Sequence, residues 1–112
     1  MEVIKKFPED MDARTAYKLM KSPEGKKMLE AEGSVLQVQS WILYNSPDKD
    51  TGEIKEVLAI ETPDNEIFAT ISNTFKEEFM DMVNYFGSDL GAIKVITGTS
   101  KAGRTYITCS IA

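Results

Sequence analysis

The spacing of apolar residues changes along the chain, and it predicts helices first and strands afterwards. Residues 10–33 read as two short helices with apolar side chains at helical spacing. Asp12 is placed to cap the first helix. Ser22 and Pro23 form the N-cap and first turn of the second, and Gly33 ends it. This pattern predicts a helical N-terminal extension.

From residue 34 onward, β-branched and aromatic residues follow a period of two, which is typical of strands. The segment 34–45 is long enough to bend near Ser40 and to serve two sheet faces. The pattern predicts one helix, 73–87, and five strands: 34–45, 54–62, 66–72, 92–98 and 104–112. Thr74 and Glu77 are spaced as a capping box for the helix. Its apolar stripe is predicted to be core: Phe75, Phe79, Met82, Val83 and Phe86.

The strands and helix follow the order β-β-β-α-β-β over residues 34–112. This order is typical of the OB-fold, a five-stranded, partly open Greek-key barrel with its helix between the third and fourth strands. We therefore expect one domain, 1–112, that is mainly β with helices and α+β by content. Residues 1–33 form its helical extension, and residues 34–112 form the OB-like barrel.

The stretch "GTSKAGRT" at residues 98–105 has the spacing of a phosphate-binding P-loop, except that Arg104 takes the place of the lysine. A working P-loop leads into a helix whose N-terminus receives the phosphates. Here a β-patterned segment, "TYITCSIA", follows instead. The stretch therefore predicts a hairpin turn rather than a nucleotide-hydrolysing site.

Charge is distributed unevenly along this chain of 112 residues, whose net charge is −5. Residues 34–89 hold three lysines against eleven carboxylates, whereas residues 90–112 hold three cations and no carboxylate. The negative net charge argues against a broad basic surface that binds duplex DNA. The C-terminal segment can still attract an anion through its local field.

Charge and aromatic side chains together predict a groove for single-stranded nucleic acid. Such binding needs cations for the phosphates and rings on which bases stack. The cationic candidates are Lys55, Lys94, Lys101 and Arg104, and the aromatic candidates are Trp41, Tyr44, Phe68 and Tyr106. Alternation predicts that Phe68 and Tyr106 point outward from their strands. Trp41 shares its face with both glutamines and apolar residues, so its pattern fits the core and the surface equally.

The strand order and the closing "SKAGRTYITCSI" resemble small single-stranded-DNA-binding proteins of bacteriophages and bacterial mobile elements. The resemblance implies a non-enzymatic protein that coats exposed single strands during replication or recombination, in the cytoplasm of a bacterial cell or phage host. It also implies that Lys101, Arg104 and Tyr106 contact the strand. RNA in place of DNA, and assembly into a homo-oligomer, both stay open.

Other classes receive less support from the sequence. An acidic interaction or inhibitor module, acting through the carboxylate-rich middle, is the main alternative. We expect no catalysis, because the chain has no histidine and its one thiol, Cys109, reads as a buried strand residue. We expect no cofactor or metal, since "DKDTGE" at 48–53 departs from the calcium-loop pattern. No secretory signal or membrane-spanning stretch is predicted.

Overall fold

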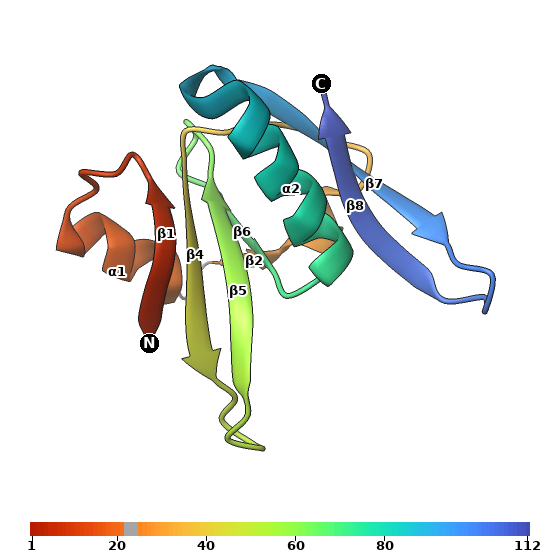
Figure 1. Cartoon of the computed structure of the whole chain (residues 1–112), viewed down its shortest axis with the longest axis horizontal. Coiled ribbons are helices and arrows are strands. Elements are labelled where there is room, and N and C mark those ends of the chain that lie inside the picture. Colours follow the sequence, from red (N-terminus) through yellow and green to blue (C-terminus); the bar gives the residue numbers. More distant parts are fainter. Residues whose placement is uncertain (22–24) are drawn as a thin grey trace.

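Two sheets with helices packed against them form the computed structural model, which describes residues 1–21 and 25–112 (Figure 1). The chain is mixed α+β. Its helices are α1 (Ala13–Lys21), α2 (Asn73–Phe86) and two 3-10 helices, η1 (Met28–Ala31) and η2 (Gly87–Asp89). Its strands are β1 (Glu2–Phe7), β2 (Lys26–Lys27), β3 (Val35–Gln37), β4 (Ser40–Pro47), β5 (Ile54–Glu61), β6 (Ile67–Thr70), β7 (Ala92–Thr99) and β8 (Thr105–Ile111).

The two sheets are separate. The first has the order β1-β4-β5-β6-β2 and is antiparallel except for the β2–β6 pair, whereas the second has the order β3-β7-β8. The predicted succession of a three-stranded meander, a helix and a hairpin is confirmed as β4-β5-β6, α2 and β7-β8. The expected partly open, five-stranded Greek-key barrel of the OB-fold is not confirmed, because the strands form two sheets and β6 pairs with β2 and not with β8.

The long strand predicted at 34–45 is divided between the two sheets. β3 pairs with β7, and β4 pairs with β1 and β5. The break falls at Val38 and Gln39, whose N–H groups donate to the carbonyls of Gly91 and Glu61 at 2.8 and 3.0 Å. The segment therefore serves two sheets, as its length suggested, through this break rather than through a bulge.

The N-terminal third differs most from the prediction. Residues 2–7 form β1, an edge strand whose hydrogen bonds come from β4, a partner far away in the sequence. The first predicted helix is confirmed as α1, because Asp12 Oδ1 accepts the N–H of Thr15 at 2.8 Å. In place of the second helix the chain forms β2 and η1. The expected start at Ser22 and Pro23 lies outside the described residues.

Apolar side chains fill both faces of the first sheet. On one face, α1 covers a cluster that includes Ile42, Ala59 and Ile67. On the other face, α2 lies between the two sheets, and its Phe79 ring meets Trp41 edge-on, with centroids 5.6 Å apart (Figure 1). The central strands of this sheet are therefore buried on both sides.

Interactions between residues close in the sequence determine where helix α2 begins and ends. Ser72 is its N-cap and accepts the N–H of Phe75 at 3.3 Å, so the capping box predicted from Thr74 and Glu77 is wrong by two residues. Gly87, with a φ of 59°, ends the helix as predicted. Phe75 and Phe79 are fully buried as expected, but Phe86 is 37% exposed because it lies beyond the core at the helix end.

Candidate nucleic-acid interface

Three of the four aromatic candidates lie inside the protein. Trp41, Tyr44 and Phe68 are 3%, 6% and 6% exposed, so the outward position predicted for Phe68 is wrong. Alternation along β6 places Ile67 under α1 and Phe68 toward α2 and the second sheet, and both sides are covered. These three rings cannot stack on a base, because they already fill the core.

Tyr44 lies beneath α1. Its hydroxyl donates to the carbonyl of Met20 at 3.4 Å, and burial raises the pKa of its phenol. The ring thus helps to hold α1 on the sheet. The small part of Tyr44 that is exposed lines a hollow beside Leu19 and Met20, and the ring itself is not open to a stacked base.

The stretch with P-loop spacing is the tip of the β7–β8 hairpin, as predicted. Ser100 N–H donates to the carbonyl of Arg104 at 2.8 Å, and Gly103 N–H donates to the carbonyl of Ser100 at 2.9 Å. Gly103 has a φ of 80°, a left-handed conformation that glycine adopts without strain. A four-residue turn that ends on a left-handed glycine is a common way to close a short hairpin.

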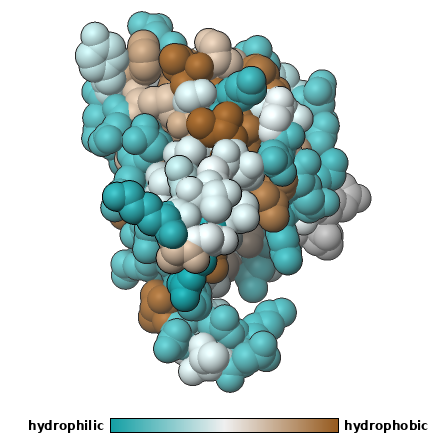
Figure 2. Space-filling model, turned by 90° about the vertical axis from the view of Figure 1, so that its right-hand side faces the viewer, coloured by the Kyte–Doolittle hydropathy of each residue, from teal (hydrophilic) through white to brown (hydrophobic). Residues whose placement is uncertain are grey.

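The hairpin has two distinct faces, because residues opposite each other share a side. Ile93, Val95 and Cys109 point into the core and are buried. The other face, which we call the outward face, is formed by the opposed pairs Lys94–Ser110, Ile96–Thr108 and Gly98–Tyr106. On this side of the molecule, pale, near-neutral atoms lie at the centre, hydrophobic atoms lie above and beside them, and hydrophilic atoms lie along much of the rim (Figure 2).

Tyr106 is the one aromatic candidate that is exposed, with 41% of its surface open. Its ring lies across Gly98 of the neighbouring strand, so close that a Cβ at position 98 would stand 2.5 Å from the ring's Cζ and hydroxyl oxygen. A glycine at this point lets the ring lie flat on the backbone. The result is a supported, solvent-facing aromatic surface on the outward face.

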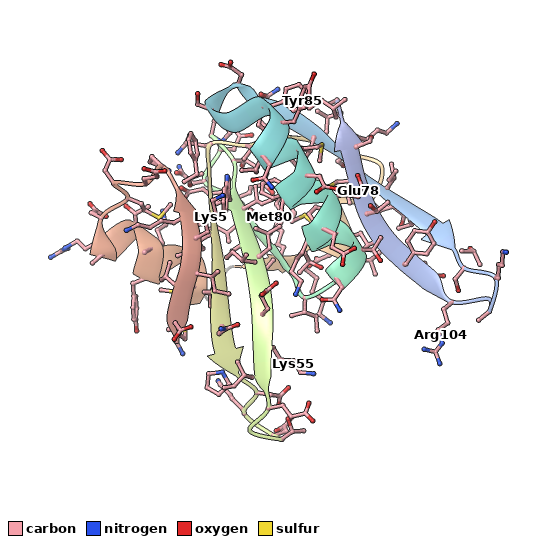
Figure 3. All side chains as sticks on the ribbon, in the orientation of Figure 1. Lys5, Lys55, Glu78, Met80, Tyr85 and Arg104 are labelled. Carbon is pink, nitrogen blue, oxygen red and sulfur yellow. The ribbon has the colours of Figure 1, made fainter. Side chains whose placement is uncertain are left out.

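Three cations belong to the same hairpin. Lys94, Lys101 and Arg104 are exposed, and Arg104 extends away from the tip (Figure 3). Within residues 1–21 and 25–112, no carboxylate lies within ion-pairing distance of any of them. Their charges are therefore available to an anion.

Lys55 lies on another hairpin, near the free end of β5. Its Nζ is 3.5 Å from a carboxylate oxygen of Glu53, in an exposed pair. Figure 3 shows Lys55 and Arg104 at the ends of two different hairpins. The structure thus gathers Lys94, Lys101, Arg104 and Tyr106 on one element and leaves Lys55 apart from them.

Sequence reasoning missed the part played by Gly98. The loop length gives the signal, since a turn over Ser100–Gly103 places position 98 opposite Tyr106. Sequence reasoning had, however, assigned Cys109 to the interior of a strand, and this is confirmed. Burial is the main cause that raises the pKa of this thiol to about 12, with a smaller contribution from Glu78.

Nothing in the described part of the chain resembles a metal centre, since no three His, Cys, Asp or Glu side chains are grouped to hold an ion. Asp48, in the loop that resembles a calcium site, instead accepts the N–H groups of Asp50 and Thr51, which lowers its pKa. Neither α1 nor α2 is long and apolar enough to cross a membrane. Comparisons with protein-family models, curated proteins and solved structures gave no match.

Proposed function

We propose that this protein binds single-stranded nucleic acid, DNA foremost, through the outward face and tip of the β7–β8 hairpin. The observation that carries the proposal is the placement of an exposed ring, Tyr106 on Gly98, beside three cations on an element without a carboxylate; among the described residues, these cations form no ion pair. Stacking and phosphate neutralisation are the two requirements of sequence-independent binding to single strands.

Each group has a defined role. A base stacks on the Tyr106 ring, while Lys94, Lys101 and Arg104 neutralise neighbouring phosphates. The hydroxyls of Thr108 and Ser110 lie on the same face and donate to phosphate or sugar oxygens. Because every base offers a π-face, this arrangement supports little sequence preference.

The proposal is narrower than the eight-residue groove expected from the sequence, since Trp41, Tyr44 and Phe68 are withdrawn from it. Lys55 becomes a secondary contact from the neighbouring hairpin. The fold is then an opened relative of the OB barrel, with the β4–β5 and β7–β8 hairpins in the places of its ligand-framing loops. In this role the protein coats exposed strands during replication or recombination in a bacterial cell or its phage, without catalysis or cofactor.

Fluorescence anisotropy with a labelled six-nucleotide oligo-dT, titrated at 50 and 200 mM salt, tests the proposal. Three phosphate contacts predict a slope of log affinity against log salt of about −2, at about 0.7 per contact. K101A/R104A should reduce this slope to about −0.7. K5A/K49A, which removes two exposed lysines elsewhere, should leave it unchanged.

Absence of binding at 50 mM salt would contradict the proposal. It would favour the acidic interaction module, whose surface is the carboxylate-rich segment 34–89. An unchanged slope in K101A/R104A would place the phosphate contacts away from the hairpin tip.

A further inference from the structure

The outer surface of α1 carries a second cationic and aromatic stripe. The side chains at i, i+3, i+4 and i+7 are exposed, whereas Ala16 and Leu19 on the opposite side of the helix pack on the first sheet. We call this stripe the α1 face: Arg14, Tyr17, Lys18 and Lys21. α1 itself contains no carboxylate.

Helix stability alone does not account for the α1 face. Lys18 and Lys21 lie in the last turn, where the helix dipole favours cations, but Arg14 lies in the first turn, where the dipole disfavours them. Tyr17 is 61% exposed between these cations, so its ring contributes little to the core. Lys18 Nζ lies 3.7 Å from the buried carboxylate of Glu61, whereas Arg14 and Lys21 have no ion pair within the described residues. In a chain of net charge −5, these two cations beside an open ring are suited to a polyanion with stacking surfaces.

Two hollows connect α1 with the hairpin. The first, of about 420 Å³, has an apolar floor that includes Val57, Ala69, Ile71 and Ile107. The second, of about 230 Å³, continues it toward Leu19 and Met20 of α1. They share Lys27 and Ala69, so they form one continuous groove. It begins at Ile107, whose side chain lies on the face of β8 opposite to Tyr106, and it ends beside Leu19 and Met20 at the edge of α1, so a strand that follows it passes around the edge of β8.

We infer that the same nucleic-acid strand that the hairpin binds continues along this groove and ends on the α1 face, which is a second contact region of the protein. The inference rests on the proposed function. The occupant is nucleic acid, because the α1 face combines the positive charges of Arg14 and Lys21 with an exposed ring and complements a phosphodiester chain. Lys27 is exposed at the point where the two hollows meet and contacts the strand between the two regions.

The size of the molecule sets the length of strand required. α1 and the hairpin tip lie at opposite ends of the view in Figure 1, along the 41 Å axis of the protein. At about 3.4 Å per nucleotide for a stacked strand, this distance corresponds to about 12 nucleotides. That length falls within the roughly 4–16 nucleotides covered by single domains that bind this way. Six nucleotides therefore reach one region only.

The test compares oligo-dT of 6 and 18 nucleotides in anisotropy titrations at several salt concentrations. The wild-type slope should be about −2 on the short strand and about −4 on the long strand, because Arg14, Lys21 and Lys27 then contact phosphates in addition to the three hairpin cations. R14A/K21A should reduce the slope by about 1.4 on the long strand and leave the short strand unaffected. K5A/K49A, with the same loss of charge, should match the wild type on both.

Tyr17→Ala provides a second readout that involves no charge. It should lower affinity for the 18-nucleotide strand about 5-fold or more, and change affinity for the 6-nucleotide strand less than 2-fold. The variants should keep the wild-type melting temperature, because their side chains are exposed.

Two results separate failure of this inference from failure of the proposed function. Equal wild-type slopes on both lengths, or an R14A/K21A protein that matches the wild type on the long strand, would overturn the α1 face alone. Loss of all binding to the six-nucleotide strand would instead overturn the hairpin site, and the inference with it.

Discussion

Removing the Tyr106 ring should weaken nucleic-acid binding without destabilising the fold. The ring is 41% exposed and lies on Gly98, so it contributes little to the core and is open to a base. Loss of one stacked base costs about 1–3 kcal/mol, which corresponds to roughly 5- to 150-fold in affinity. Tyr106→Phe retains the ring and should bind within about 3-fold of the wild type.

The assay is anisotropy with six-nucleotide oligo-dT at 200 mM salt, because electrostatic attraction is weakened there and stacking contributes a larger share. Gly98→Ala is an independent test of the same contact. Its new Cβ would stand 2.5 Å from the ring, so the ring must move off the backbone while the hydroxyl and every charge remain. It should lose affinity toward the level of Tyr106→Ala. If Tyr106→Ala binds within 2-fold of the wild type, the stacking role is refuted.

Three further predictions concern the fold that supports the site. Phe79→Ala should destabilise the protein by about 3–5 kcal/mol in chemical denaturation, since the ring is fully buried against Trp41; a loss below 1 kcal/mol would contradict this packing. Cys109 should resist thiol reagents at pH 8 until the protein unfolds. The pKa of its thiol is about 12 in the folded protein and 9.0 ordinarily, so its contribution to stability is complete below pH 9 and is lost as the pH rises toward 12. A free energy of unfolding that does not change between pH 9 and 12 would contradict this burial. Gly103→Val should lower the free energy of unfolding by about 1–2 kcal/mol, because the φ of 80° at this position is strained for a residue with a side chain. Thermal melts measure the change, and an unchanged melting temperature would contradict it.

Local sequence signals were sufficient for the second half of the chain. The meander, α2 and the β7–β8 hairpin depend on alternation, capping and a glycine turn, all of which act over a few residues. The exposed position of Tyr106 followed from the same alternation, and 41% of its surface is open on the outward face. The stretch with P-loop spacing at 98–105 was correctly predicted to be a hairpin turn, because the β pattern of the segment after it is also a local signal.

The failures involve contacts between distant segments. Alternation correctly indicated that Ile67 and Phe68 point to opposite sides of β6, but not that α1 and α2 cover both sides. β1 was missed because its hydrogen bonds depend on β4, about forty residues later. The α1 face was also missed, because exposed cations on a helix indicate a binding surface only when the groove beside the helix is known.

The most direct test of the central claim is a map of backbone amide chemical shifts during titration with six-nucleotide oligo-dT. The account predicts the largest changes in the hairpin, at Lys94 and over residues 98–106, and only small ones along the acidic surface of α2. Largest changes at Glu77, Glu78 or Asp81, with an undisturbed hairpin, would contradict it.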